Sequence, residues 1–322
     1  MFKKVGVVGL GTMGASIAEL MAFNDLEVTM VDQNDELVNR GLKTVERILN
    51  SYLQFSKSRE EKEIKRIESL GVTLSSEQKA EIEKHLSSDF NEKTLQKALD
   101  RLHPTTDFSE LKKCEHVVEA VFEKIDIKMN VFRKLSESCS PECIISSNSS
   151  SLSITKLASC VTNPQRVILT HFFNPPYTLP LIEIVKAMQT SEDTESKVVE
   201  FYSSIKNHRT MMKPIRVKEV PGFLVNRLLV PILNEACFAL DEGIASRDDI
   251  DTAMKLGAGM PMGPLELTDM VGVDIALDVM EILQKEYGDP KYRPSTILRK
   301  MVDAGKTGRK SGSGFYAYNK KA

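Results

Sequence analysis

Apolar residues form two kinds of pattern along the first two thirds of the chain. Short continuous runs rich in Val and Ile predict buried strands, and stretches with apolar residues three or four apart predict amphipathic helices. Because the two kinds alternate, we expect an α/β fold with a doubly wound parallel sheet. The predicted strands are 4–10, 27–31, 116–121, 142–147, 166–170, 181–185 and 214–217, and the predicted helices are 15–23, 35–55, 109–113, 124–138, 152–158 and 194–206.

Two parts of the chain depart from this alternation. Residues 56–100 are rich in Lys and Glu and predict two or three amphipathic helices that project from the core, either as a solvated insertion or as an arm that closes over a substrate. After Pro221 the pattern is helical throughout. We therefore predict a Rossmann-type domain over residues 1–219, with a helical arm at about 56–100, and an all-helical domain over 220–322 whose apolar stripes pack internally and form a dimer seam.

The first predicted strand is followed at once by Gly-Leu-Gly-Thr-Met-Gly and then by a helix. This is the context in which G-x-G-x-x-G binds a dinucleotide. Gly9 allows the tight turn, Gly11 lets a pyrophosphate approach the backbone, and Gly14 lets the helix pack on the strand. Asp32 ends the second strand, where a carboxylate accepts hydrogen bonds from ribose hydroxyls and repels a 2′-phosphate. The motif therefore predicts NAD rather than NADP.

Composition narrows the class of protein. The chain has 322 residues, 41% of them hydrophobic, and a formal net charge of −2. It can form a packed core, and it has no overall charge that favours nucleic acid or an anionic membrane. No apolar run approaches the roughly 20 residues of a membrane-spanning helix. The N-terminus runs directly into the first strand without room for a signal peptide, so we expect a cytoplasmic protein.

The five cysteines form no C-x-x-C pair, which fits a reducing compartment. Cys139 and Cys143 are four residues apart near a predicted loop. A metal site there needs further ligands that the neighbouring sequence does not provide. We interpret the two as incidental thiols and expect no metal.

Polar residues follow four of the predicted strands, at the edge where open α/β sheets bind ligands. An imidazole there can accept a hydroxyl proton near neutral pH. His171 ends an apolar strand, and the chain reversal after it could bring Glu183, a carboxylate in another apolar strand, next to its ring. From spacing alone, a structural histidine and an edge-strand glutamate are an equal alternative. The four polar residues are Asp32, Glu123, Ser150 and His171, and the histidines expected at surface or loop positions are His85, His103, His116 and His208.

Several motifs resemble those of the L-3-hydroxyacyl-CoA dehydrogenases of fatty-acid β-oxidation, over nearly the whole chain. They are Asn-Ser-Ser-Ser-Leu at 148–152, His-Phe-Phe-Asn-Pro at 171–175, Glu183, and the segments 220–227, 255–269 and 310–316. The resemblance implies that His171 removes the 3-hydroxyl proton as hydride passes to NAD, and that Glu183 orients the imidazole. It implies that Ser150 and Asn226 hydrogen-bond substrate oxygens. It also implies an NAD site lined, beside the glycine loop, by Glu123, Lys128, Asn174 and Lys310.

Three segments depart from the family pattern. Residues 56–100 are longer than the family's helical hairpin, which helps to hold coenzyme A, so no residue is assigned to gripping CoA. Residues 207–213 also form a longer segment than the family pattern has. Residues 176–180 resemble the branch of the family that contains lambda-crystallin and carnitine dehydrogenase. Our first hypothesis is a homodimeric NAD-dependent oxidoreductase for short acyl-CoA substrates such as acetoacetyl-CoA. The second is a dehydrogenase of a free hydroxy acid such as L-carnitine or gulonate, and the third a non-catalytic, crystallin-like NAD-binding protein.

Overall fold

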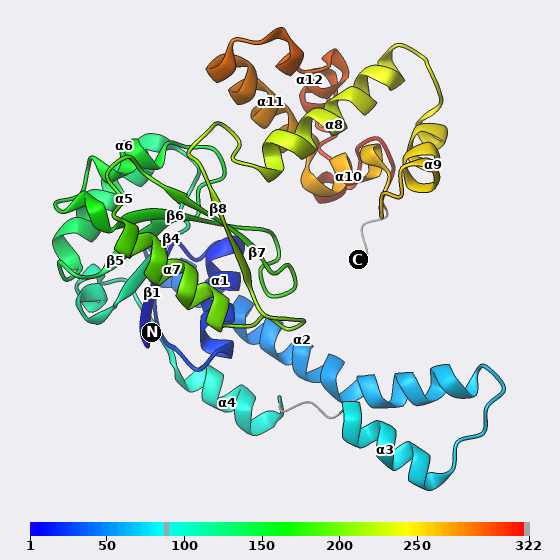
Figure 1. Cartoon of the computed structure of the whole chain (residues 1–322), viewed down its shortest axis with the longest axis horizontal. Coiled ribbons are helices and arrows are strands. Elements are labelled where there is room, and N and C mark those ends of the chain that lie inside the picture. The colour runs from blue at the N-terminus through cyan, green and yellow to red at the C-terminus, as the bar shows by residue number, and fades with distance from the viewer. Residues whose placement is uncertain (87–89, 319–322) are drawn as a thin grey trace. The chain divides into compact units, whose positions relative to one another are not determined.

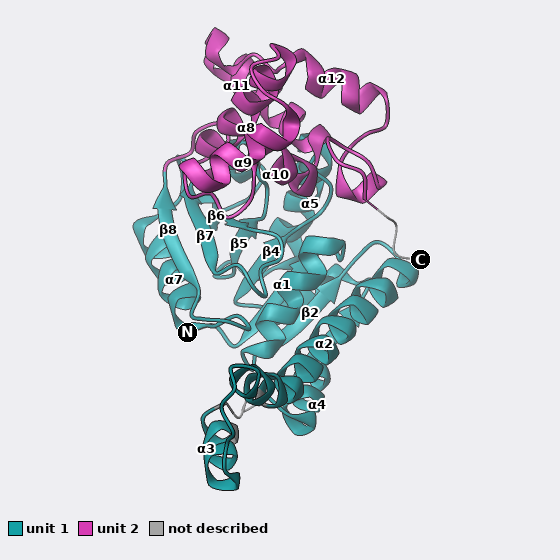
Figure 2. Ribbon diagram, turned by 90° about the vertical axis from the view of Figure 1, so that its right-hand side faces the viewer, with its two compact units in different colours: residues 1–217 teal, residues 218–322 magenta. Residues whose placement is uncertain are grey.

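The computed structural model describes residues 1–86 and 90–318. The chain divides into two compact units, Met1–Val217 and Lys218–Ala322, which are coloured separately in Figure 2. We call them the first unit and the helical unit and describe each by itself.

The first unit is built on an eight-stranded sheet with the order β3-β2-β1-β4-β5-β6-β7-β8. Neighbouring strands are parallel throughout, except that β7 runs antiparallel to β6. The predicted doubly wound, Rossmann-type sheet is therefore confirmed. The strands are β1 Lys4–Val8, β2 Glu27–Val31, β3 Leu102–Thr105, β4 His116–Glu119, β5 Ile144–Ser147, β6 Val167–Phe172, β7 Leu181–Lys186 and β8 Lys213–Val217.

The central strands are apolar because they are covered on both faces. Every residue of β4, β5 and β6 is buried, which is why these strands read as continuous runs rather than as alternating patterns. Residues of α1, α2 and α7 share one buried cluster with the strands. The helices of this unit are α1 Thr12–Phe23, α2 Asp35–Glu68, α3 Ser76–Leu86, α4 Glu92–Asp100, α5 Ile125–Ser138, α6 Ile154–Ala158 and α7 Glu192–Ser204, with 3₁₀ turns η1 Phe108–Lys113 and η2 Pro164–Arg166.

The helical arm differs from its prediction in where the first helix ends. Helix α2 continues to Glu68 as one 34-residue helix instead of ending at residue 55. Its outer half carries pairs such as Glu61–Lys65, which support an exposed helix. Figure 1 shows the outer half of α2 and all of α3 extending away from the sheet, as expected of projecting helices.

Two further local predictions were wrong. Strand β3 was not predicted, because Pro104 breaks the strand pattern; it is tolerated because β3 is an edge strand paired only with β2. The helix expected from residue 152 begins at Ile154, and its cap is Ser153, whose side chain accepts a hydrogen bond from the Lys156 N–H. Ser151, the predicted cap, instead donates from both its N–H and its hydroxyl to Glu123.

The helical unit contains no strand among its described residues, 218–318. Two buried aspartates tie it together. Asp251 accepts hydrogen bonds from the Leu265 and Glu266 N–H groups at the start of α10, and Asp269 accepts from the N–H groups of Phe315 and Tyr316. Its helices are α8 Val225–Asp241, α9 Arg247–Gly257, α10 Pro264–Val271, α11 Val273–Tyr287 and α12 Thr296–Asp303, with η3 Pro290–Tyr292 and η4 Arg309–Ser311. In the described part of the chain, no helix combines the length and the apolar character needed to cross a membrane.

Candidate active site

The glycine loop between β1 and α1 is shaped by the lack of side chains. Gly9 has a φ of +89°, and a Cβ there would lie 2.8 Å from the Val121 N. A Cβ on Gly14 would lie 1.7 Å from the Gly9 carbonyl oxygen, whereas a Cβ on Gly11 would meet nothing within 4 Å. Gly11 also precedes α1 without any side-chain cap. The loop therefore closes tightly against the sheet and leaves open space at the positive end of a helix, which fits a pyrophosphate.

Asp32 lies at the end of β2 and contacts this loop directly. Its Oδ2 accepts a hydrogen bond from the Leu10 N–H at 2.7 Å, and its Oδ1 accepts one from the Gln33 N–H at 2.7 Å. Each carboxylate oxygen has a second lone pair. The carboxylate is thus fixed beside the glycine loop, where a ribose of a bound dinucleotide would lie.

A buried ion-pair cluster organises the end of β4. The Lys128 ammonium donates to Glu119 Oε1 at 2.6 Å and to the Val121 carbonyl at 3.2 Å, and it lies 3.3 Å from Glu123 Oε2. Glu119 also accepts the Ser147 hydroxyl at 2.7 Å. The Lys128 side chain is 1% exposed, so its charge is neutralised inside the protein rather than offered to solvent. Glu119 is a residue of this cluster that the sequence analysis did not single out.

Glu123 accepts hydrogen bonds from the serines that follow β5. One of its oxygens, Oε1, accepts the Ser149 hydroxyl at 2.6 Å and the N–H groups of Ser150 and Ser151 at 2.8 and 3.2 Å. Burial opposes ionisation, but the Lys128 charge and the bonds from Ser149 and Ser150 together lower the pKa of Glu123. The carboxylate is therefore held ionised, and Glu123 and Ser150 are brought into direct contact.

His171 and Glu183 face each other across the one antiparallel pair of strands in the sheet. They are register partners, and His171 Nδ1 lies 2.7 Å from Glu183 Oε2. The side chains are 8% and 0% exposed. The chain reversal thus places the glutamate where the spacing suggested. The Asn148 side chain accepts a hydrogen bond from the Phe172 N–H at 3.0 Å, which ties this strand end to the loop that carries Ser150.

Two family models match the chain: the 3-hydroxyacyl-CoA dehydrogenase NAD binding domain over residues 4–84 and 65–220, and the 3-hydroxyacyl-CoA dehydrogenase C-terminal domain over residues 222–318. The chain belongs to the 3-hydroxyacyl-CoA dehydrogenase family. The family predicted from the motifs and the NAD-binding domain predicted from the glycine loop are both confirmed.

Relatives of this dehydrogenase family align along nearly the whole chain. A probable 3-hydroxybutyryl-CoA dehydrogenase of Deinococcus radiodurans is 38% identical over 98% of this chain and 100% of its own. The mitochondrial hydroxyacyl-coenzyme A dehydrogenase of Homo sapiens is 36% identical over 98% of this chain and 91% of its own. The crystal structure of the (S)-3-hydroxybutyryl-CoA dehydrogenase of Ralstonia eutropha, 38% identical, covers 99% of this chain and 100% of its own with a TM-score of 0.83.

The other residues that the family motifs single out lie on different elements of the two units. Asn174 is exposed in the loop after β6. Asn226 is in the first turn of α8 in the helical unit. Lys310 lies in η4 of that unit, and its ammonium is 2.5 Å from Asp274 Oδ2. Within the described residues, no three His, Cys, Asp or Glu side chains are grouped so that they could hold a metal ion.

Two of the histidines expected at surface or loop positions have buried side chains. His116 begins β4; its ring nitrogens lie 3.1 Å from the Ile144 carbonyl and 2.9 Å from the Tyr202 hydroxyl, and burial lowers its pKa to about 4. His208 does lie in a loop, but its side chain is 7% exposed and pairs with Glu19. The surface prediction was therefore wrong for His116 and incomplete for His208. The missed signal is a carboxylate within an apolar helix, because Glu19 lies inside α1 and needs a partner.

Proposed function

We propose that this protein oxidises (S)-3-hydroxyacyl-CoA to 3-oxoacyl-CoA with NAD, and that short acyl chains are its substrates. The observation that carries the proposal is the buried His171–Glu183 pair on the same sheet as an open glycine loop with Asp32 beside it. Membership of the 3-hydroxyacyl-CoA dehydrogenase family supports the reaction. The relatives named 3-hydroxybutyryl-CoA dehydrogenase support the short chain length.

In this proposal His171 is the base. With Glu183 ionised, the hydrogen bond between them keeps a proton on Nδ1, so Nε2 is the nitrogen that accepts the 3-hydroxyl proton. The carboxylate also stabilises the imidazolium that forms. Bound NAD supplies the acceptor for the hydride that leaves C3. Withdrawal of the hydroxyl proton makes that departure easier, so the base and the hydride acceptor act on one carbon–oxygen unit.

The remaining residues have supporting roles in the proposal. Ser150 and Asn226 hydrogen-bond substrate oxygens, and Asn174 and Lys310 belong to the NAD site; these assignments rest on the family motifs. Glu123, whose side chain is 37% exposed, also belongs to the NAD site and holds the loop that carries Ser150. We revise the role of Lys128: because its ammonium is buried against Glu119 and Glu123, it positions these carboxylates rather than lining the nucleotide.

The assembly that we propose is a homodimer formed through the helical unit, in the cytoplasm. Leu224, Leu228 and Ile232 recur every four residues along α8 and its N-cap and are 44%, 60% and 46% exposed. Such spacing places them on one face of a helix. An apolar stripe of this kind is typical of an interface. Light scattering of the purified protein tests the dimer, and Leu228→Lys is expected to shift it toward the monomer.

The activity is tested by following NADH absorbance with acetoacetyl-CoA as substrate. We expect turnover with acetoacetyl-CoA and much slower turnover with free acetoacetate, and none with NAD and L-carnitine or gulonate. Faster reaction with the free acids would replace the proposal by the hydroxy-acid alternative. That alternative rests on the resemblance of residues 176–180 to the carnitine dehydrogenase branch. NADH binding without any turnover would favour the crystallin-like alternative.

A further inference from the structure

Three ionisable side chains after β4 carry one excess negative charge. Glu119 is the last residue of β4, Glu123 lies in the loop that follows, and Lys128 lies in α5. Glu119 and Lys128 are 0% and 1% exposed, whereas the Glu123 side chain is 37% exposed. Two carboxylates and one ammonium together leave one negative charge. Because little water screens charges inside the protein, the way in which the ammonium is shared decides where that charge lies.

Hydrogen-bond donors surround the Glu119 carboxylate. Its Oε1 accepts the Val121 N–H at 2.7 Å and the Lys128 ammonium at 2.6 Å, and its Oε2 accepts the Ser147 hydroxyl at 2.7 Å. The Ser147 oxygen itself accepts the Ser149 N–H at 3.2 Å, so the hydroxyl proton is free to point to Glu119. Acceptance from three donors at both oxygens favours the ionised form of a carboxyl group. Glu119 is therefore a buried anion.

Lys128 is paired more closely with Glu119 than with Glu123. Its ammonium lies 2.6 Å from an oxygen of Glu119 and 3.3 Å from one of Glu123. Because Glu119 lies wholly inside the protein, water screens its attraction for the ammonium less than it screens that of the partly exposed Glu123. The ammonium therefore mainly neutralises Glu119, and the excess negative charge stays on Glu123.

The chain between the two glutamates touches the glycine loop. A Cβ on Gly9 would lie 2.8 Å from the Val121 N and 2.9 Å from the carbonyl carbon of Ala120, and the Ala120 N–H donates to the Val8 carbonyl at 2.8 Å. The excess charge is thus fixed beside the loop that fits a dinucleotide. NAD⁺ and NADH have the same pyrophosphate and riboses, but the nicotinamide ring of NAD⁺ carries a positive charge that NADH lacks. A negative charge in this site therefore favours NAD⁺.

We propose that Glu119 sets the preference of the site for the oxidised cofactor. By neutralising Lys128, it leaves the charge of Glu123 to attract the nicotinamide cation, which favours binding of NAD⁺ and release of NADH. The proposal rests on the proposed function, from which it takes the dinucleotide site. Because Glu119 is buried, it acts through Lys128 and Glu123 and is a positioning residue rather than a ligand of the cofactor.

The ratio of two dissociation constants tests the proposal. NADH is titrated by its fluorescence, and NAD⁺ by displacement of NADH at constant ionic strength. In Glu119→Gln, Lys128 is left to neutralise Glu123, so the ratio of the Kd for NAD⁺ to the Kd for NADH should rise about fivefold. A loss of packing alone would weaken the binding of both forms equally and leave the ratio unchanged. An unchanged ratio in the folded variant therefore overturns the proposal.

Two further variants separate charge from structure. The double variant Glu119→Gln/Lys128→Met loses one charge of each sign and keeps Glu123 charged, so its ratio should return to within about twofold of the wild type. A ratio that stays at the value of Glu119→Gln contradicts the role of Lys128. Glu123→Gln removes the charge itself at a partly exposed side chain, where unfolding is less of a risk. Its ratio should rise at least as much as that of Glu119→Gln, and an unchanged ratio overturns the proposal as well.

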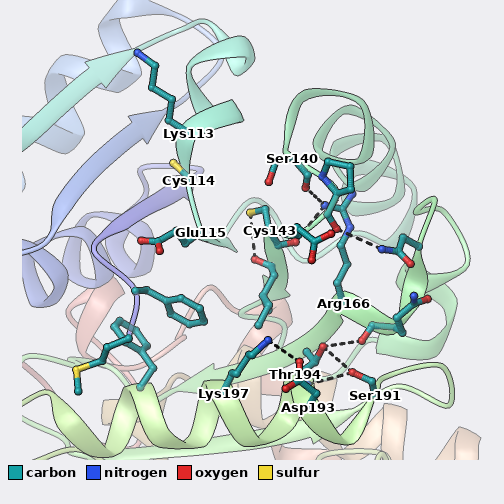
Figure 3. A pocket seen from close by; sticks show the side chains of 18 of the residues that line it. Lys113, Cys114, Glu115, Ser140, Cys143, Arg166, Ser191, Asp193, Thr194 and Lys197 are labelled. Carbon is teal, nitrogen blue, oxygen red and sulfur yellow. Dashed lines mark hydrogen bonds and ion pairs between the residues drawn. The ribbon is translucent and has the colours of Figure 1, made fainter.

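The opposite end of β4 provides the matched control. Glu115 precedes the strand, accepts the N–H groups of Lys3 and Lys4 at 2.6 and 3.0 Å, and lines a cavity of about 470 Å³ at the amino ends of β4, β5 and β6 (Figure 3). Four residues of strand, about 13 Å, separate it from Glu119. Glu115→Gln should therefore leave the ratio within about 1.5-fold of the wild type.

Two outcomes separate the proposal from its foundation. A rise of the ratio in Glu115→Gln equal to that in Glu119→Gln would mean that the net charge of the protein sets the ratio, which overturns the proposal. A wild-type protein that binds neither NADH nor NAD⁺ overturns the proposed function. Binding of both forms with no change of ratio in Glu119→Gln overturns the role of Glu119 alone.

Discussion

Two regions of the first unit contain the same chemical pair in different settings. His171 and Glu183 lie on adjacent strands, and His208 and Glu19 join the loop before β8 to helix α1. In both, an imidazole nitrogen lies 2.7 Å from a carboxylate that is 0% exposed. The distance and the burial within each pair therefore do not distinguish the catalytic pair from the other one. Only the first lies at the strand end tied to the loop that carries Ser150, so position in the sheet assigns the base.

The surroundings of the second pair indicate a structural role. The Tyr52 ring stacks on His208 with centroids 3.9 Å apart, and the Phe23 ring lies edge-on at 4.9 Å. Glu19 Oε2 is buried without a hydrogen-bond partner among the described residues, and burial raises the pKa of Glu19. Glu183, by contrast, is fixed by strand register. The register thus sets the position of Glu183 relative to its histidine.

Replacing each histidine gives the largest expected difference between the two pairs. His171→Ala should lower kcat by about 10³-fold, because the general base is lost, while the affinity for NADH is kept. His208→Ala is the matched control, and its kcat should stay within about threefold of the wild type. Steady-state kinetics with acetoacetyl-CoA and NADH titration by fluorescence measure both. Equal losses in the two variants would remove the distinction.

Replacing each carboxylate by its amide is expected to have the next largest effect. Glu183→Gln should lower kcat by about 10²-fold, because an amide neither fixes the imidazole tautomer nor stabilises the imidazolium. Glu19→Gln should leave kcat nearly unchanged. A Glu183→Gln variant with wild-type kcat would show that the strand register alone orients His171.

The stability of Glu19→Gln should depend on pH in a defined direction. A carboxyl group whose pKa is raised by folding stabilises the protein below its unfolded pKa, near 4.5, and loses that contribution as pH rises through the folded pKa. Relative to the wild type, the free energy of unfolding of the glutamine variant should therefore rise between pH 4.5 and pH 7. Urea denaturation at the two pH values measures this difference, and a constant difference would contradict the buried-acid interpretation.

A third histidine–carboxylate pair supplies the smallest expected effect. His103 and Glu27 are also 2.7 Å apart, but their side chains are 54% and 46% exposed. Water screens such a pair, so His103→Ala should change the free energy of unfolding by less than about 0.5 kcal/mol and leave kcat unchanged. Thermal denaturation and the NADH assay measure this. A larger loss would mean that exposure does not govern the strength of these pairs.

The sequence predicted those features that depend on neighbouring residues. The glycine loop, Asp32 and the alternation of strands and helices follow from local patterns. The buried pairs Glu119–Lys128 and Glu19–His208 join residues whose contact only the folded chain creates, and they were missed. Their signal was present, since a carboxylate inside an apolar run needs a partner; it was used for Glu183 and could have been used for both. The length of α2 was underestimated because no apolar residue lies between Phe55 and Ile64, so the apolar pattern is interrupted inside the helix.

Because β7 is antiparallel to β6, the position of Glu183 depends on the length of the connection between the two strands. Side chains alternate between the two faces of a strand, so a shift of β7 by one residue along β6 would turn Glu183 to the opposite face and bring Glu183's apolar neighbours opposite His171. Insertions or deletions in residues 173–180, which join the two strands, therefore act on proton transfer even when every polar side chain is kept. Homologous chains that differ in the length of this connection are expected to have lost the carboxylate opposite the base or to supply it from another position.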